Sequence, residues 1–425
     1  MGNHGLAVIS IMAACDNGFG ITGLVPEARF SGRSWQPDAG NIPDVSSTLL
    51  STGAFLDPGE MYLIEIHAPG PSQGTTCPCN CGQFEFIAME YWQDNFDVIQ
   101  ANSANGRICV EAAGNGSMDL DWAGYSGAFN RSVRDSGALL VGAGEPGMTH
   151  NPSCFTNHGS RVDFYGWGDG VYAAGYGEAF DQGGCTQDYT PFFSGTSSAT
   201  PIVAGAAASL ALIHRNKLGS FPTPASLRSR LSINGTDQGP ADPHREIGVM
   251  PNLRGVLAPD LLPFTPAGWH GPLVPANISG GGLPAVLDPF PYPNYLRINW
   301  RNASLYGDVD ASHVKLWRDD VLAANYTVPA TAAGQFNGRN VSNVGMRGGR
   351  HYLRMALDPD ELLVEAVETN NTFVESFCWN PVAVTDGLPA AFSRGPKKDR
   401  KVPWNWPWTA SATAATSPGT GRSSE

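Results

Sequence analysis

The sequence has little charge for its length. Only 15% of its 425 residues are charged, and 26 Lys and Arg face 39 Asp and Glu, which gives a formal net charge of −13. Such a chain offers little basic surface to neutralise phosphates, so we expect neither a nucleic-acid partner nor an anionic membrane surface. It also shows no apolar run of the length that predicts a membrane span.

A conventional secretion signal is missing as well. The apolar stretch 6–14 could be the core of a signal peptide, but no basic residue precedes it. We therefore predict that it forms a buried helix of the folded domain. The eight cysteines and several Asn-x-Ser/Thr triplets nevertheless fit an oxidising compartment, and we expect a secreted protein.

The first 258 residues show the pattern of an α/β domain. Near-continuous apolar runs at 62–66, 108–112 and 138–142 are typical of buried parallel strands. Apolar helices are expected to begin near His4 and at Ser197. Pro201 would lie in the first turn of the second helix, where proline is tolerated.

The composition changes after residue 258. Residues 259–291 are rich in Pro and Gly, which predicts a linker. Alternating apolar and polar residues between 292 and 384 predict a half-exposed antiparallel β-sandwich. The polar stretch 385–425 is predicted to be a disordered tail, although the Trp-rich run 404–408 within it could dock on a carbohydrate or a partner.

A serine lies where a glycine-containing turn meets the second apolar helix, in the stretch 194–205. The N-terminus of a helix presents free N–H groups and a positive dipole end, which suits a nucleophile that attacks a carbonyl. By itself, Ser197 could equally be a helix cap. The stretch resembles the serine motif of subtilisin-like serine proteases (subtilases, peptidase family S8), Gly-Thr-Ser-x-Ala-x-Pro-x-Val-Ala-Gly, at every fixed position. This resemblance implies that Ser197 is the nucleophile.

Two further stretches resemble motifs of that family. His4 and the residues up to 28 resemble its histidine motif, with Leu6 where Thr is usual, and imply that His4 is the general base rather than a frayed terminal residue. The stretch 111–116 resembles its Ala-Ala-Gly-Asn segment and implies that Asn115 donates to the oxyanion, although Asn-Gly can also be a plain turn. Asn115 begins a glycosylation triplet, which we discount because a glycan would block the site.

The resemblance covers nearly all of residues 4–258. It implies a subtilisin-like three-layer α/β domain with a mainly parallel sheet, followed by an immunoglobulin-like sandwich. It also implies peptide or protein substrates, no cofactor for the chemistry and a monomer, while structural calcium stays open. The substrate subsites are expected to be lined by His67, Ala68, Gly70, Ala112, Ala113 and Gly114.

The aspartate of the family's catalytic triad is missing from this sequence. It should precede the histidine motif, but only three residues precede His4. The triplet 135–137, Asp-Ser-Gly, imitates the aspartate motif, but it follows Asn115 and matches a different strand. We expect that the chain is truncated before the aspartate. The alternative is a genuine product that keeps the fold as a non-catalytic binding protein.

The cysteines and the C-terminal acidic residues give weaker signals. The run 77–81 holds three cysteines that could bind a metal, but its spacing favours a disulfide-bearing surface insertion. Cys154 could pair with Cys185, and Cys15 and Cys109 are expected to be buried thiols. The stretch 349–371 resembles the end of a CARDB-type domain. Four acidic residues there could bind calcium, although a solvated acidic hairpin is the other interpretation: Asp358, Asp360, Glu365 and Glu368.

These expectations lead to a first prediction. Without the aspartate, His4 lacks the partner that would fix its tautomer, so the 425-residue chain should hydrolyse peptides more slowly than a version extended upstream by an Asp-Ser/Thr-Gly strand, by several orders of magnitude. Peptide hydrolysis at equal folded concentration measures the difference. Equal rates would show that another residue orients His4.

Overall fold

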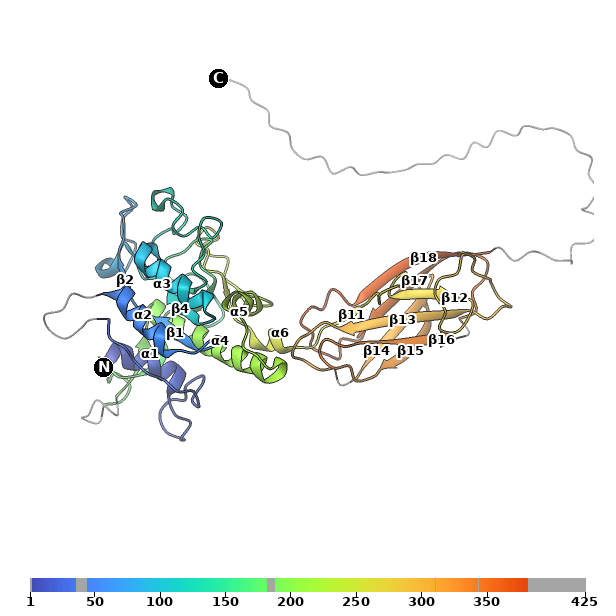
Figure 1. The fold of residues 1–425 in the computed structure, drawn as a ribbon, viewed down its shortest axis with the longest axis horizontal. Helices are drawn as coiled ribbons and strands as arrows, with labels where there is room; N and C mark the ends of the chain where they lie inside the picture. The colour runs from blue at the N-terminus through green and yellow to red at the C-terminus, as the bar shows by residue number, and fades with distance from the viewer. Residues whose placement is uncertain (1, 36–43, 182–187, 310, 343, 381–425) are drawn as a thin grey trace, which may run out of the picture. The chain divides into compact units, whose positions relative to one another are not determined.

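The computed structural model describes residues 2–35, 44–181, 188–309, 311–342 and 344–380 (Figure 1). Cys185 and the predicted tail at 385–425 lie outside the described residues.

A mainly parallel sheet forms the centre of the N-terminal half. Its neighbouring strands run parallel except for the last pair, β10 and β9. The strands predicted at 62–66, 108–112 and 138–142 are confirmed as β1, β4 and β5. The order across the sheet is β1 (Met61–Ile64), β4 (Ile108–Ala112), β5 (Leu139–Gly144), β6 (Phe164–Trp167), β10 (Val249–Met250) and β9 (Thr236–Asp237).

Helices cover both faces of this sheet, so the predicted three-layer α/β architecture is confirmed. One hydrophobic cluster joins α4 and its neighbours to one face, and another joins α2 and α3 to the opposite face. The first group comprises α1 (Asn3–Ala13), α4 (Thr196–Leu218), α5 (Pro224–Leu231) and α6 (Leu253–Leu257); the second comprises α2 (Val45–Phe55) and α3 (Gln93–Ala104).

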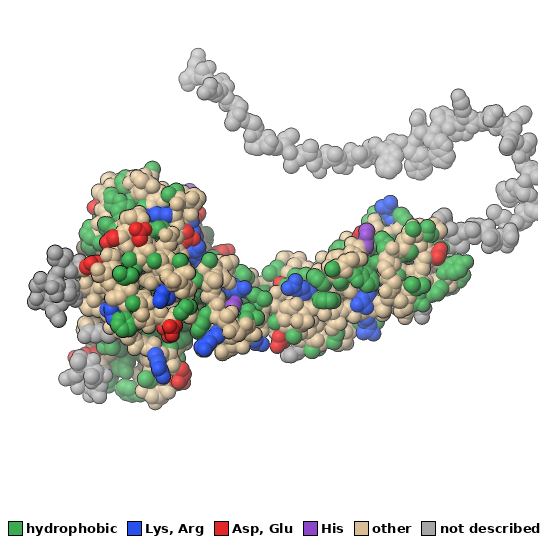
Figure 2. Space-filling model, in the orientation of Figure 1, with side chains coloured by type: hydrophobic (Ala, Val, Ile, Leu, Met, Phe, Trp, Pro, Cys, Tyr) green, Lys and Arg blue, Asp and Glu red, His purple; other side chains and the backbone are tan. Residues whose placement is uncertain are grey.

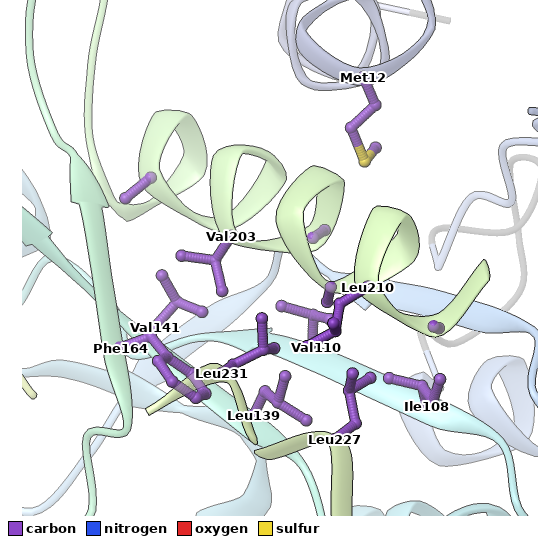
Figure 3. Packing of buried hydrophobic residues seen from close by; sticks show 14 of the residues in the cluster. Met12, Ile108, Val110, Leu139, Val141, Phe164, Val203, Leu210, Leu227 and Leu231 are labelled. Atoms are coloured by element: carbon purple, nitrogen blue, oxygen red, sulfur yellow. The ribbon is translucent and has the colours of Figure 1, made fainter. Parts of the chain in front are cut away.

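The long helix α4 packs closely on the sheet. Figure 3 shows Val203 and Leu210 of α4 pointing toward the strands, while Met12 of α1 approaches α4 from its other side. The approach is closest at Gly166 of β6, where an added Cβ would lie 2.6 Å from the carbonyl oxygen of Ala199. Glycine at 166 therefore lets the first turns of α4 lie directly against the strand.

The structure also tests three expectations about helices. Helix α1 buries four of its apolar side chains, as predicted for a helix of the folded domain. Pro201 is the sixth residue of α4 and not in its first turn, so the carbonyl of Ser197 lacks its usual helical donor. Contrary to the expectation from apolar runs, α4 is long and apolar enough to cross a membrane, but this is weak evidence because core helices pass the same test and 61% of its apolar window is buried.

Two short antiparallel pairs lie outside the central sheet. One pairs β2 (His67–Pro69) with β3 (Phe86–Ala88), and the other pairs β7 (Val171–Ala174) with β8 (Tyr189–Phe193). Single turns of 3-10 helix occur at η1 (Cys81–Gln83), η2 (Met89–Tyr91) and η3 (Ala123–Tyr125).

Two four-stranded antiparallel sheets form the C-terminal half and enclose one hydrophobic core. This confirms the predicted β-sandwich. The segment predicted as a linker, 259–291, supplies two of its strands, because its β11 and β12 both pair with β13. The first sheet contains β11 (Leu261–Pro263), β12 (Leu273–Ala276), β13 (Tyr295–Asn302) and β16 (Phe336–Ser342); the second contains β14 (Ser312–Arg318), β15 (Val321–Val328), β17 (Gly349–Leu357) and β18 (Thr372–Trp379).

Charged groups are distributed in two different ways. On the face drawn in Figure 2, Lys and Arg side chains are dispersed among other residues. Inside the α/β half, Arg161 is almost fully buried and binds the carboxylates of Glu90 and Asp163 at 2.6 and 2.8 Å. Glu111 on β4 is fully buried beside them, and its Oε1 accepts the backbone N–H of Glu90 at 2.9 Å.

The buried Glu111 should make folding stability depend on pH. Burial, reinforced by the charge of Glu90, raises the pKa of Glu111 to about 8. The unfolded chain releases this proton near its ordinary pKa of about 4.5, so the free energy of unfolding should fall as the pH rises from about 4.5 to 8. Glu111→Gln keeps the acceptor oxygen without the titration and should remove this part of the slope, stabilising the protein most above pH 8.

Chemical denaturation between pH 5 and 9 measures this slope. Glu27→Gln, at an exposed carboxylate, is the matched control and should change little. A Glu111→Gln variant with the same pH slope as the native chain would contradict the assignment.

Candidate active site

Ser197 lies at the N-terminus of α4, as its second residue. The preceding Gly195 has a φ of +97°, a conformation that favours glycine, and its N–H donates to the carbonyl of Gly168 at 2.9 Å. This turn leaves Ser197 half-buried at a helix end whose backbone N–H groups have no acceptor within the helix. The arrangement places a hydroxyl beside donors for negative charge.

Asn115 follows β4 and is buried, with 7% of its surface exposed. Its Oδ1 accepts two hydrogen bonds from Thr196, one from the backbone N–H at 2.8 Å and one from Oγ1 at 2.9 Å. Because both acceptor contacts are on Oδ1, the amide Nδ2 is the atom left to donate beside Gly195, where an added Cβ would lie 3.1 Å from it.

The Nδ2 of Asn115 has an acceptor from the insertion between β2 and β3. It donates to Oε1 of Gln83 at 3.1 Å. The amide oxygen of Gln83 is chemically similar to a peptide carbonyl. Oε1 of Gln83 therefore lies where a carbonyl oxygen of a substrate would accept a hydrogen bond from Nδ2 of Asn115.

His4 is the second residue of α1 and stays largely exposed. Its ring lies 5.7 Å from that of Phe193, which is four residues before Ser197, and α1 packs along α4. Partial burial lowers the pKa of His4 below its ordinary value of 6.5. No hydrogen bond joins His4 to Ser197 in the described part of the chain.

His67 of β2 is a second histidine at this site. Its Nδ1 accepts the backbone N–H of Asn115 at 3.2 Å. Burial, with a smaller effect from the like charge of His4, lowers the pKa of His67 to about 4, so the ring is neutral at pH 7.

The expected subsite residues come together, but they pack against one another. Gly114 is closed in by its neighbours, since an added Cβ would lie 3.1 Å from the oxygen of Phe86 and 3.4 Å from Cβ of His67. Ala112 and Ala113 are buried at 3% and 0% exposure. At Gly70 an added Cβ would lie within 2.4 Å of Ile87, the neighbour of Phe86 on β3, and Ala68 pairs with the same Ile87.

The cysteine-rich insertion carries disulfides, as predicted. Cys77 pairs with Cys81, and Cys79 pairs with Cys154, 75 residues away. The suggested bond between Cys154 and Cys185 is therefore wrong, because Cys79 takes this partner. The second disulfide holds the insertion next to the loop of Asn115, since the Cys154 carbonyl also accepts Ser117 Oγ at 2.8 Å.

Two cysteines in the described part of the α/β half are free thiols, and they differ in exposure. Cys109 is buried, as expected, but Cys15 is exposed. Cys15 lies beyond the last residue of α1, where the chain leaves the packed face.

Asp135 does not serve the active site. It forms a two-point ion pair with Arg228 of α5, with contacts of 2.9 and 2.5 Å. This supports the rejection of 135–137 as the aspartate motif.

Two of the four acidic residues of the sandwich are buried and bind protein donors, while Asp360 and Glu368 stay exposed to solvent. Asp358 is buried and accepts Ser312 Oγ at 2.6 Å, and Glu365 is buried and accepts the Leu261 N–H at 2.6 Å. Asp360 pairs with Lys315, and Glu368 accepts the N–H of Glu365. Within the described residues, no group of three or more His, Cys, Asp or Glu is arranged to hold a metal ion.

Two residues that bind Asn115 are not predicted from the sequence: Thr196 and Gln83. Thr196 stands beside the serine in the motif, where it gives no signal separate from the motif itself. Gln83 lies in an insertion without a motif, so no signal could have found it.

Comparison with known proteins decides the family. The model of the subtilase family matches residues 1–249. The chain belongs to the subtilase family. Its serine, histidine and asparagine motifs thus lie within a domain of that family, and the expected resemblance is confirmed.

Individual relatives match only parts of this subtilase. Subtilisin-like protease 2 of Pseudogymnoascus destructans is 30% identical over 152 residues, which are 36% of this chain and 32% of the relative. Subtilisin-like protease 1 of the same fungus is 32% identical over 154 residues, again 36% and 32%. The chain thus spans about a third of the length of the curated relatives it matches.

Solved structures resemble each half. Patellamide maturation protease PatA matches 60% of this chain and 82% of its own at 20% identity, with a TM-score of 0.38. The CARDB domain of a Pyrococcus furiosus protein in complex with di-metal ions matches 29% of this chain and 96% of its own at 16% identity, with a TM-score of 0.23.

The orientation of Asn115 by Thr196 gives the next prediction. Thr196→Val removes the hydroxyl donor but keeps the backbone donor, so it should weaken donation by Asn115 and slow covalent labelling of Ser197 by a fluorophosphonate about fivefold, as expected for the loss of about 1 kcal/mol. Thr200→Val is the matched control, because its hydroxyl bonds only the Thr196 carbonyl one turn away. Equal slowing in both variants would contradict a specific role for Thr196.

Proposed function

We propose that this subtilase is a serine endopeptidase that hydrolyses peptide bonds through an acyl-enzyme intermediate. Ser197 is the nucleophile, His4 the general base and Asn115 a donor to the oxyanion. The proposal is carried by one observation: both bonds from Thr196 reach Oδ1 of Asn115, which leaves Nδ2 as a donor beside the N-terminus of the helix that bears Ser197.

The proposed reaction begins at the Ser197 hydroxyl. Its oxygen attacks the carbonyl carbon of the scissile peptide while its proton passes to His4, and the protonated His4 then gives that proton to the leaving amine. The lowered pKa of His4 supports this role, because the ring is neutral at pH 7 and able to accept a proton. Water repeats the sequence on the acyl-enzyme and releases the second product.

Negative charge develops on the carbonyl oxygen during each attack. Nδ2 of Asn115 and the backbone N–H of Ser197 are proposed to bind this charge, since both lie at the N-terminus of α4. Oε1 of Gln83 has to leave Nδ2 when substrate binds. The polypeptide carbonyl then takes the place of the Gln83 amide.

The remaining features of the proposal follow from the family and the sequence. Substrates are proteins or peptides, and the subsites are formed by His67, Ala68, Gly70, Ala112, Ala113 and Gly114. Because β2 and β3 pack against Gly114, they have to move away from it before a substrate can bind beside these residues. The chemistry needs no cofactor, and the protein is a secreted monomer, in agreement with the disulfides of the insertion.

A second candidate function is a non-catalytic binding protein with the same fold. It is favoured by the described residues around His4, in which no hydrogen bond joins His4 to Ser197 and no carboxylate pairs with the ring. The two functions differ in whether Ser197 reacts. Reactivity of Ser197 therefore decides between them.

The chain should react covalently with a fluorophosphonate at Ser197, because the phosphonyl oxygen occupies the same donors as an oxyanion. Ser197→Ala should abolish the labelling, and Asn115→Ala should slow it by about 10²–10³, the range measured for this donor in subtilisin itself. Mass spectrometry of the labelled peptide locates the site. Ser209→Ala, on the same helix with its hydroxyl on the Gly205 carbonyl, is the control and should label normally.

Labelling that persists in Ser197→Ala would refute the nucleophile. A folded native chain that does not label at all would support the binding protein.

A further inference from the structure

Gln83 occupies the amide donor that the proposed reaction requires. Its Oε1 accepts hydrogen bonds from Nδ2 of Asn115 at 3.1 Å and from Nδ2 of Asn80 at 2.9 Å. Asn80 and Gln83 both belong to the β2–β3 insertion, residues 70–85, which connects β2 to β3. The insertion thus carries both an acceptor for Asn115 and a side chain that orients this acceptor.

The β2–β3 insertion is not held in place by a hydrophobic core. None of the residues from 70 to 83 is buried, and the single turn η1, which carries Gln83, contributes no buried side chain. A polar anchor is Gln73, whose side-chain amide donates to the carbonyl of Asp119 at 2.7 Å and accepts the Asp119 N–H at 3.3 Å. A segment with so few buried contacts opens easily, so a covalent bond has a large share in fixing Gln83.

The disulfide between Cys79 and Cys154 supplies that bond. The backbone around Cys154 is fixed by Arg245, whose Nη2 donates to three carbonyls of this loop at 2.9 to 3.1 Å. Cys79 precedes Gln83 by four residues, so the disulfide limits how far Gln83 can move from Asn115. Both cysteines are exposed to solvent, where a reagent can reach them.

We infer that the β2–β3 insertion is an autoinhibitory element, in which Gln83 occupies the donor that an oxyanion would use on Asn115. The Cys79–Cys154 disulfide keeps Gln83 there until a dithiol reduces the bond. This inference rests on the proposed function of Asn115 and Ser197. Because Oε1 of Gln83 lies where a carbonyl oxygen would accept from Nδ2, a reaction at Ser197 has to displace it first.

The activating step is a thiol–disulfide exchange. One thiolate of the dithiol attacks one sulfur of the Cys79–Cys154 bond, and the other sulfur leaves as a thiolate that takes up a proton. The second thiol of the reductant then breaks the mixed disulfide. Two electrons pass to the protein, whose two cysteines become thiols, while the dithiol becomes a disulfide. The insertion, without its tether, then releases the donor of Asn115.

The first test compares the rates at which a fluorophosphonate labels Ser197 in full-length variants with intact disulfides. Gln83→Ala removes the acceptor and should raise the rate about fivefold, the effect of one hydrogen bond of ordinary strength. Gln83→Glu keeps an acceptor at this position and should not raise the rate. Gln100→Ala is the matched control and should leave the rate unchanged, because this exposed amide on α3 binds the carbonyl of Asp135.

The second test reduces the tether with dithiothreitol. The native chain should label about fivefold faster after reduction and return to the slower rate on reoxidation. The double variant Cys79→Ser and Cys154→Ser should label at the faster rate throughout and gain nothing from the dithiol. The double variant Cys77→Ser and Cys81→Ser is the matched control: it keeps the tether, so its rate should still rise on reduction.

Two outcomes overturn the inference. One is equal labelling of the native chain and Gln83→Ala, which would mean that the oxyanion uses the second hydrogen of Nδ2 on Asn115. The other is a response to dithiothreitol that is absent from the native chain, or that persists in the variant without Cys79 and Cys154.

Failure of the proposed function gives a different result. In that case no variant would label Ser197, although all of them remain folded. The side-chain amide protons of Asn115, followed by NMR and assigned with Asn115→Ala, would still shift in Gln83→Ala and stay in place in Gln100→Ala. The inhibitory role of the insertion would then fall with the function, while the contact between Gln83 and Asn115 would still be observed.

Discussion

The close approach of α4 to the parallel sheet determines the geometry of this subtilase domain. The helix can lie on β6 because Gly166 leaves room for the backbone at Ala199. The residues that face the strands from α4 are mostly Ala and Val, which are fully buried there. A bulkier side chain at either surface would move the helix, and with it Ser197, by a distance that matters to catalysis.

The position of α4 has a second consequence at the carboxyl end of β4. Asn115 follows that strand, and Thr196 begins the helix, so the sheet and the helix meet through two hydrogen bonds to one amide oxygen. These two bonds orient the amide group of Asn115 while its nitrogen, Nδ2, stays free to donate to another acceptor. The insertion held by Cys79 and Cys154 then supplies Gln83 as its acceptor, which connects the disulfides to the chemistry of the site.

Buried carboxylates of the α/β half differ in how their charge is compensated. Glu90 and Asp163 are buried with Arg161, which binds both, so most of their charge is compensated within the fold. Both carboxylate oxygens of Glu65 are buried without a hydrogen-bond partner among the described residues. Burial therefore raises the pKa of Glu65 well above its ordinary value of 4.5.

The sequence by itself determined the classes of element and the family to which the motifs belong. Near-continuous apolar runs at 108–112 and 138–142 are typical of strands in a sheet covered on both faces, and the stretch 194–205 predicts a serine at the start of a helix. The spacing of apolar residues along the chain predicts these elements, because strands and helices are formed by residues that are close in the sequence. Tertiary structure alone decided which side chains meet across long separations.

These long-range contacts explain the differences from the sequence-based predictions. Cys79 forms a disulfide with Cys154, 75 residues away. The segment 259–291 belongs to the sandwich because its strands β11 and β12 pair with β13. The carboxylates of Asp358 and Glu365 accept hydrogen bonds from a hydroxyl group and a backbone N–H. Local sequence cannot specify such partners, since each depends on the path of the whole chain.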